Sequence, residues 1–351
     1  MMLERLAPEQ HDTLDEVPEP AENPALFGHE HAAAMLTSAY RAGKLPHALI
    51  LAGPTGIGKA TFAFHLAGYL LRNPDYRAAP ATLGSPDPGS ALFRQVASGA
   101  HPGVLHLTRP QNDKTKGFKT VVTVDEVRKV SRFLSMTSHD GSYRVVIVDP
   151  ADDMNTNAAN ALLKNLEEPP ARTLFILIVH APGSLLPTIR SRCQTIRLTP
   201  LDDNSLLSAL DAAGQPAPAE PQARATLLGR AGGSVRSAIL LSQYGGLEIA
   251  EALDGVLQGG RTGIAAVHKL ADAVAGRDSA IQFDIFNRRA LDMLADAASN
   301  AALVSDLPRA KALSDAWHEA QNALSETETY NLDRKQHVLA MIDRLNAAMR
   351  M

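Results

Sequence analysis

The sequence predicts an α/β domain with a parallel sheet, followed by a small helical domain and a larger helical domain. Short apolar runs alternate with helical segments up to about residue 200. Segment 53–60 has the glycine and lysine spacing of a phosphate-binding loop between a strand and a helix. Beyond residue 246, apolar residues recur at helical spacing without a strand pattern. Alternating strands and helices indicate a parallel sheet covered by helices on both faces.

The strands are predicted from short apolar runs, because a strand of a parallel sheet is buried on both faces. Segment 48–52 ends in a glycine, and segment 144–149 ends in a carboxylate. Segments 173–179 and 194–198 complete the core of the sheet, and 121–124 has β-like composition. Helices are expected at 31–41, 60–71, 125–136 and 155–168, the last stopped by two prolines.

The domain boundaries follow changes in composition. Residues 1–23 are acidic and contain prolines, without a basic region followed by an apolar stretch, so we expect a flexible leader. The α/β domain then covers 24–200, a helical domain 201–245, and a second helical domain 246–351. Segment 71–102 is rich in Pro, Gly, Ala and Ser and is expected to be a surface insertion.

The composition is ordinary for a globular protein. The 351 residues are 45% hydrophobic and 21% charged, with a net charge of −4. That charge argues against a protein that coats nucleic acid electrostatically. The single cysteine, Cys193, excludes an internal disulfide and a cysteine-based zinc cage. Because no apolar run reaches membrane-spanning length, we expect a cytoplasmic protein without a membrane partner.

The glycine-rich segment has the features of a nucleotide cradle. Gly53, Gly56 and Gly58 allow backbone N–H groups to approach phosphate oxygens, and Lys59 would reach the β- and γ-phosphates. Ala60 stands where a magnesium-binding hydroxyl is expected. The alternative is a tight strand-to-helix turn that binds no ligand.

The catalytic equipment of this cradle is incomplete. Thr61 carries a hydroxyl one residue late, roughly 100° around the helix axis from the expected position. Asp149 stands at a strand end where a metal-binding carboxylate is expected, but Pro150 replaces the acid that would orient a water molecule. Asp149 could instead only satisfy backbone donors. The losses argue against competent hydrolysis.

Three arginines cluster near the only cysteine. Arg190, Arg192 and Arg197 surround Cys193. A guanidinium group supplied across an interface can neutralise charge on a transferring γ-phosphate. From charge alone, a surface salt bridge is the alternative.

The region around these arginines resembles the clamp-loader branch of the AAA+ family, and within it the delta prime subunits of bacterial DNA polymerase III. The resemblance is carried by segments 157–170, 173–179 and 185–193. It extends from about 23 to 242, and the remaining third matches only as a helical region of suitable length.

The resemblance implies roles for individual residues. Ser191-Arg192-Cys193 matches a motif whose arginine acts in trans on a neighbour's ATP. Arg236 matches a second sensor that approaches the chain's own nucleotide, and 26–29 matches the segment near the adenine. The family's delta prime members have weakened ATP sites, so ATP with magnesium is expected only at a degenerate site. The family's four-cysteine zinc module has no counterpart in 71–102, so no zinc is expected.

The resemblance also implies a function and partners. It implies an AAA+ P-loop domain, a helical lid and a C-terminal collar. The expected function is a clamp-loader subunit in a hetero-pentamer with motor ATPase and clamp-opening subunits. The assembly would contact the sliding clamp and primer–template DNA. Two alternatives stay open: an active AAA+ ATPase motor or helicase-loading relative, and a switch that binds ATP without hydrolysing it.

Overall fold

The computed structural model describes residues 5–112, 117–135, 142–258, 264–276 and 278–350. The chain divides into two compact units, Met1–Ala238 and Ile239–Met351. The division falls inside helix α9 (Val235–Gln243). The three-domain division expected from the sequence therefore stays a prediction.

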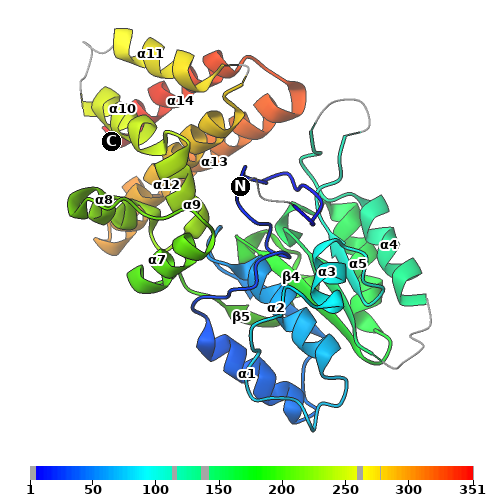
Figure 1. The fold of residues 1–351 in the computed structure, drawn as a ribbon. Helices are drawn as coiled ribbons and strands as arrows, with labels where there is room; N and C mark the ends of the chain where they lie inside the picture. Colours follow the sequence, from blue (N-terminus) through cyan, green and yellow to red (C-terminus); the bar gives the residue numbers. More distant parts are fainter. Residues whose placement is uncertain (1–4, 113–116, 136–141, 259–263, 277, 351) are drawn as a thin grey trace. The chain divides into compact units, whose positions relative to one another are not determined.

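The first unit contains a five-stranded sheet in the order β2-β3-β4-β1-β5 (Figure 1). All neighbouring strands pair in parallel. The strands are β1 (Ala48–Ala52), β2 (Val104–Leu107), β3 (Arg144–Val148), β4 (Thr173–Val179) and β5 (Gln194–Arg197). The predicted parallel sheet is confirmed, and β1 and β4 have the predicted bounds.

One predicted strand is wrong, and one observed strand was not predicted. Residue Val122 in the predicted strand 121–124 makes only an isolated bridge with Met154. Helix α4 (Val124–Ser135) already begins at the end of that segment. The fifth strand is instead β2, at the edge of the sheet, where three of four residues are only half-buried. An edge strand of mixed character lacks the continuous apolar run that reveals a central strand.

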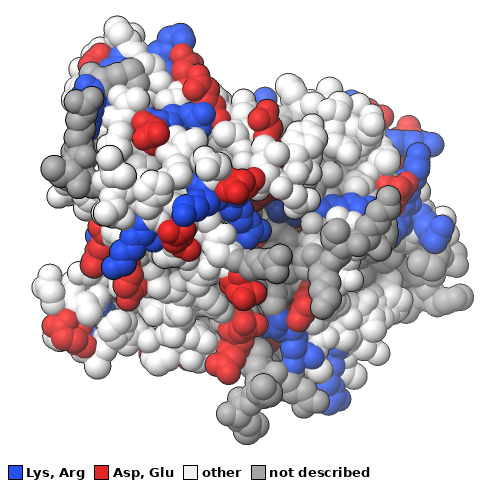
Figure 2. All heavy atoms as spheres, turned by 90° about the horizontal axis from the view of Figure 1, so that it is seen from above, with Lys and Arg blue, Asp and Glu red and all other residues white. Residues whose placement is uncertain are grey.

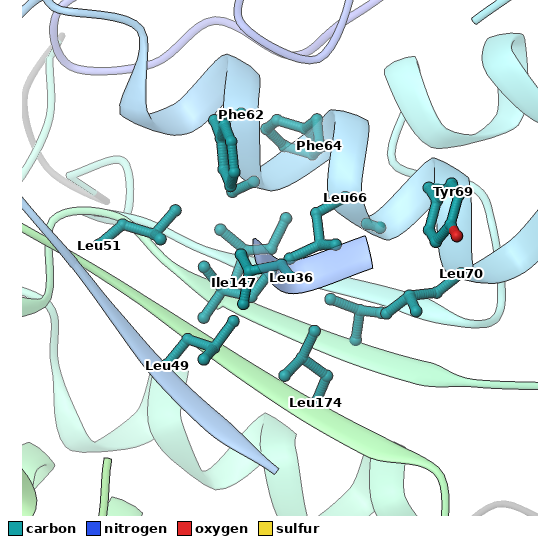
Figure 3. Packing of buried hydrophobic residues seen from close by; sticks show 14 of the residues in the cluster. Leu36, Leu49, Leu51, Phe62, Phe64, Leu66, Tyr69, Leu70, Ile147 and Leu174 are labelled. Atoms are coloured by element: carbon teal, nitrogen blue, oxygen red, sulfur yellow. The ribbon is translucent and has the colours of Figure 1, made fainter. Parts of the chain in front are cut away.

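Helices cover both faces of the sheet, as parallel strands require. On one face lie α1 (Glu30–Arg41), α2 (Lys59–Arg72) and α3 (Ala91–Ala97). Figure 3 shows Phe62 and Leu66 of α2 pointing toward Leu49 and Leu51 of β1. On the other face lie α4, α5 (Thr156–Glu167) and α6 (Pro187–Arg190). Each large apolar side chain buried here contributes about 2 kcal/mol to stability.

The segment expected to be a surface insertion packs partly into the core. Ala79, Leu83 and Val96 are buried in the same cluster as α2. The hydroxyl of Tyr69 on α2 donates a hydrogen bond to the Pro80 carbonyl at 2.6 Å. The segment therefore completes one face of the sheet.

The N-terminal segment differs from the flexible leader expected for residues 1–23. Residues 5–22, called the strap below, form successive hydrogen-bonded turns in which Leu14 is 5% and Glu19 is 6% exposed. The Ala7 N–H donates to Glu22 Oε1 at 2.9 Å. Two of the acidic side chains that suggested a solvated leader have partners inside the strap: Glu22 accepts backbone N–H groups, and Glu19 accepts from the Thr13 hydroxyl.

Every element described beyond residue 202 is a helix. The first unit ends with α7 (Asp203–Ala212), α8 (Pro221–Ala231) and the start of α9. The second unit contains α10 (Gly246–Gln258), α11 (Ile264–Val274), α12 (Ala280–Leu303), α13 (Leu307–Tyr330) and α14 (Arg334–Met349). Among the described residues, no helix has the length and hydropathy of a membrane span.

Candidate functional site

The phosphate loop stands between the end of β1 and the start of α2, as the sequence predicts. Gly56 and Gly58 have φ angles of 78° and 95°, a left-handed conformation that favours glycine. Helix α2 begins at Lys59. The loop therefore has the strand-to-helix position that the sequence predicts, and its role in phosphate binding stays a prediction.

The ammonium group of Lys59 is hydrogen-bonded to carbonyl groups of the loop itself. Lys59 is 3% exposed, and its Nζ donates to the carbonyls of Gly53 at 2.7 Å and Pro54 at 2.5 Å. Burial lowers the pKa of Lys59 to about 8, although Asp149 and Asp152 oppose the shift. A phosphate group would have to replace the two carbonyls to use this cation.

The turn before α9 packs directly on the loop. The Val235 N–H donates to the Gly56 carbonyl at 2.9 Å, and Ser234 Oγ donates to the Thr55 carbonyl at 2.9 Å. A Cβ atom at Gly56 would lie 2.4 Å from Ser234 Oγ and 2.6 Å from the Cβ of Arg236. The small size of Gly56 is therefore needed for this close approach, and the approach brings Arg236 to the loop.

The guanidinium group of Arg236 contacts the strap. Arg236 Nη1 donates to the Asp12 carbonyl and lies 3.5 Å from the carboxylate oxygen Oδ2 of Asp12. The Arg236 side chain is 17% exposed. The residue assigned to the chain's own nucleotide thus has an anionic partner from the same chain.

Segment 26–29 also lies against the loop. His29 Nε2 donates to the Ile57 carbonyl at 2.8 Å, and His29 directly precedes α1. Gly28 is crowded, because an added Cβ would lie 2.6 Å from Leu201. The segment that the resemblance places near an adenine therefore adjoins the cradle.

The predicted metal-binding carboxylate lies in an acidic neighbourhood. Asp149 follows β3, and its N–H donates to the Leu107 carbonyl at 2.9 Å. Burial raises the pKa of Asp149 to about 7, and the charges of Asp12, Asp152 and Asp153 add to the shift against the opposing effect of Lys59. In these surroundings the carboxyl group is more stable when it is protonated or bound to a cation than when it is ionised and alone.

The two carboxylates after Pro150 have structural roles. Asp152 Oδ2 accepts hydrogen bonds from the backbone N–H groups of His180 at 3.0 Å and Ala181 at 2.9 Å. Asp153 Oδ2 lies 2.5 Å from Arg109 Nε. They connect the end of β3 to the segments after β2 and β4. Neither carboxylate replaces the acidic residue that would orient a water molecule and whose position Pro150 occupies.

The donor set fits magnesium poorly. Ala60 offers no oxygen, and Thr61 is buried on α2. Among the described residues, no group of three His, Cys, Asp or Glu side chains has the arrangement of a metal site. Asp149 therefore stands without the second protein ligand that phosphate loops normally supply.

Arg192 lies between α6 and β5 and is partly exposed. Its Nη2 donates to Glu167 Oε1 at 2.7 Å, and its Nη1 donates to the Thr188 carbonyl at 2.9 Å. The Arg192 side chain is 36% exposed and that of Glu167 is 50% exposed. An exposed ion pair of this kind contributes at most about 1 kcal/mol, so the arginine can change partner at little cost.

The strand register separates Arg192 from the chain's own cradle. In the parallel pair of β5 and β1, Arg197 lies opposite Ala52, the last residue before the loop. Gln194, the first residue of β5, lies opposite Leu49 near the start of β1, and Arg192 is in the turn just before it. Arg192 therefore lies at the end of the sheet where the strands begin, while the loop lies where they finish.

Cys193 beside this arginine is a half-buried free thiol. It packs against the core on the face of α4 and α5. Burial raises the pKa of Cys193 to about 11, so the thiol stays protonated near neutral pH. The segment around Cys193 therefore offers Arg192, and not a nucleophile, to a ligand.

Sequence reasoning missed two partners of the predicted residues. Asp12 contacts Arg236 across a separation of 224 positions, and Glu167 contacts Arg192 across 25. Composition gave no signal for the first pair. The Glu167-Glu168 pair before the prolines is visible in the sequence, but its spatial neighbour is not.

The sequence also matches known proteins. The family described as "DNA polymerase III, delta subunit" matches residues 28–202. DNA polymerase III subunit delta' of Pseudomonas aeruginosa is 38% identical over 212 residues, which are 60% of each chain. The subunits delta' of Escherichia coli and Bacillus subtilis are 36% and 33% identical, over 47% and 49% of this chain. The alignments span 46% to 60% of these relatives' lengths.

Proposed function

We propose that this chain, which belongs to the delta prime-like clamp-loader family of DNA polymerase III subunits, serves the ATP site of a neighbouring subunit. The observation that carries the proposal is the position of Arg192. It is partly exposed, it is held by an ion pair with Glu167 and a hydrogen bond to the Thr188 carbonyl, and it lies at the opposite end of the sheet from the chain's own phosphate loop. A guanidinium group placed there can reach only a nucleotide that another chain holds.

Little or no hydrolysis is expected at the chain's own cradle. Lys59 is hydrogen-bonded to loop carbonyls, Ala60 lacks the metal-binding hydroxyl, and Pro150 lacks the carboxylate. Phosphoryl transfer depends almost entirely on positioning and charge neutralisation. A site without a residue that positions the water molecule and without the hydroxyl that binds the metal ion has lost the main contributions to the rate of hydrolysis.

The partners follow from the delta prime role. The chain would join motor ATPase and clamp-opening subunits in a hetero-pentamer in the cytoplasm. On the face shown in Figure 2, basic and acidic side chains of the described residues are interspersed. The net charge of −4 agrees with a subunit that meets primer–template DNA and the sliding clamp through the assembly.

The test is the substitution Arg192→Ala in the reconstituted complex. Arg190→Ala is the matched control, because Arg190 is also exposed and lies two residues away. We expect Arg192→Ala to leave assembly intact in gel filtration. Single-turnover ATP hydrolysis at the affected site should fall by about 10³, the lower end of the effect of an arginine finger. Unchanged DNA-stimulated ATPase would remove Arg192 from this role.

An active motor ATPase or helicase-loading relative is the second candidate. Its support is the loop backbone, in which Gly56 and Gly58 have the conformation that phosphate binding needs, and Asp149 at the strand end. This candidate predicts Mg-ATP turnover by the isolated chain that Lys59→Ala abolishes. Absence of turnover would exclude it.

A further inference from the structure

The strap is a folded element and not an extended tail. Arg5 Nη2 donates to the carbonyls of Leu14 at 2.9 Å and Val17 at 3.2 Å. Glu22 accepts the N–H groups of Ala7 at 2.9 Å and Glu19 at 3.1 Å through its two carboxylate oxygens. These contacts close the strap on itself, in the manner of a compact surface loop.

The strap is attached to the unit at the phosphate end of the sheet. Figure 1 draws it in dark blue, close to α2 and β4. His65 Nε2 on α2 donates to the Asn23 carbonyl at 2.9 Å, which fixes the point where the strap ends. At the other contact, Asp12 meets Arg236 through both its carbonyl and its carboxylate.

Asp12 lies among the charged groups of the cradle. Besides burial, the charge of Asp12 raises the pKa of Asp149, and it opposes the lower pKa that burial gives His106. The charges of Arg236 and His180 in turn lower the pKa of Asp12. The Asp12 side chain is 46% exposed. Partial desolvation raises its pKa, but Arg236, with smaller help from His11 and a backbone hydrogen bond, holds the pKa below its ordinary value. Asp12 is thus a carboxylate anion close to Asp149, at the edge of the sheet where the phosphate loop lies.

The hold of Asp12 on Arg236 is incomplete. Within the described part of the chain, the buried Nε of Arg236 has no hydrogen-bond partner. A buried donor without a partner is costly, and a planar guanidinium group is best satisfied by an anion with several oxygens. A phosphate group offers more acceptors than the single carbonyl and the carboxylate oxygen that Asp12 presents.

We propose that the strap is a built-in competitor of nucleotide, in which Asp12 takes the guanidinium group of Arg236 and closes the chain's own nucleotide site. A nucleotide phosphate and Asp12 cannot share the same donors of Arg236. A triphosphate that takes the Nη1 donor of Arg236 must therefore displace Asp12. The inference concerns the chain's own cradle and does not depend on the role of Arg192.

The test measures binding of Mg-ATP by calorimetry to the isolated full-length chain and its variants. Asp12→Ala removes the carboxylate, and a chain without residues 1–22 removes the strap. Glu9→Ala is the matched control, because Glu9 is an exposed acidic residue of the strap. Circular dichroism establishes that each variant is folded.

We expect Asp12→Ala to tighten binding of Mg-ATP by about tenfold or more, since charged contacts of a buried guanidinium contribute at least about 1.4 kcal/mol. The shortened chain should bind at least as tightly, and Glu9→Ala should bind as the unaltered chain does. Equal affinity in all four proteins would overturn the proposal. Absence of binding by every folded variant would also overturn it, because the strap would then not be what closes the site.

Hydrogen exchange gives a second readout that needs no nucleotide affinity. The N–H groups of Ala7, Gln10 and Glu19 are bonded within the strap and should be protected. Arg236→Ala should lower this protection, and Arg192→Ala should not. Protection that is independent of Arg236 would show that the contact does not hold the strap. Because the proposed function is read from ATPase of the assembly, either conclusion can fail without the other.

Discussion

The two ends of the sheet present their cations in opposite ways. Where the strands finish, Lys59 is hydrogen-bonded to loop carbonyls and Arg236 contacts Asp12, so both charges are engaged by the chain itself. Where the strands begin, Arg192 is partly exposed and paired with an exposed glutamate. The difference teaches that the two cations at the loop end are engaged by groups of the same chain, whereas Arg192 at the other end is partly exposed.

The largest effect is expected from a conservative substitution of Arg192, at the end of the sheet where the strands begin. Arg192→Lys keeps the charge but loses the planar pair of donors that matches phosphate oxygens. We expect single-turnover ATPase at the affected site of the assembly to stay reduced by about 10²-fold or more. Full activity with lysine would mean that only a positive charge is needed, and the finger geometry would be rejected.

At the inward end, two glycines of the loop should differ in their effect on stability. Gly56→Ala places a Cβ 2.4 Å from Ser234 Oγ at a φ of 78°, so we expect a loss of about 3 kcal/mol. Gly58→Ala meets only His29 Nε2 at 3.8 Å, and its strain alone should cost about 1 kcal/mol. Urea denaturation followed by circular dichroism measures both. Equal losses would mean that the turn before α9 does not press on the loop.

The acidic groups around Asp149 predict that removing its charge increases the stability of the chain by an amount that depends on pH. Because the pKa of Asp149 is raised to about 7, the folded state disfavours its ionised form, and the penalty grows as pH rises from about 4 to 7. Asp149→Asn should therefore stabilise the chain by about 2 kcal/mol at pH 8 and by much less at pH 4.5. The urea midpoints of both proteins at the two pH values test this. A gain that is larger at the lower pH would contradict the raised pKa.

The smallest effect is expected at the glutamate beside Arg192. Glu167→Gln breaks an ion pair whose two side chains are 36% and 50% exposed. The free energy of unfolding should change by less than about 0.5 kcal/mol, as is typical of exposed pairs. A loss above about 2 kcal/mol in urea denaturation would show that Arg192 is firmly held, and so less available to a neighbour.

Local patterns predicted the central part of the fold. The runs that form β1, β3 and β4 are short and mostly apolar, and the helices between them follow the expected periodicity. The edge strand β5 was predicted although only Ile196 of its four residues is buried. Edge strand β2 was missed because its residues are only half-buried. The strap was mistaken for a leader because its order comes from hydrogen bonds and from a contact 224 positions away, and neither changes the composition.

The candidate site was predictable to a similar degree. The order of strand, loop and helix places Lys59 after β1 and Asp149 after β3, at the same edge of the parallel sheet with β4 between the two strands. Arg236 and Arg192 were assigned only through resemblance to the family, and their roles stay predictions. The similarity to delta' subunits supports the resemblance itself. Their partners Asp12 and Glu167 depend on tertiary packing, so no spacing in the sequence could reveal them.

The most direct test places both ends of the sheet in one assay. The clamp-loader assembly is reconstituted with the unaltered chain, with Lys59→Ala, or with Arg192→Ala, and DNA-stimulated ATP hydrolysis is measured after gel filtration shows equal assembly. The account predicts that Lys59→Ala leaves ATPase unchanged while Arg192→Ala lowers it. Loss of ATPase with Lys59→Ala and full activity with Arg192→Ala would show that the chain uses its own cradle and does not serve its neighbour.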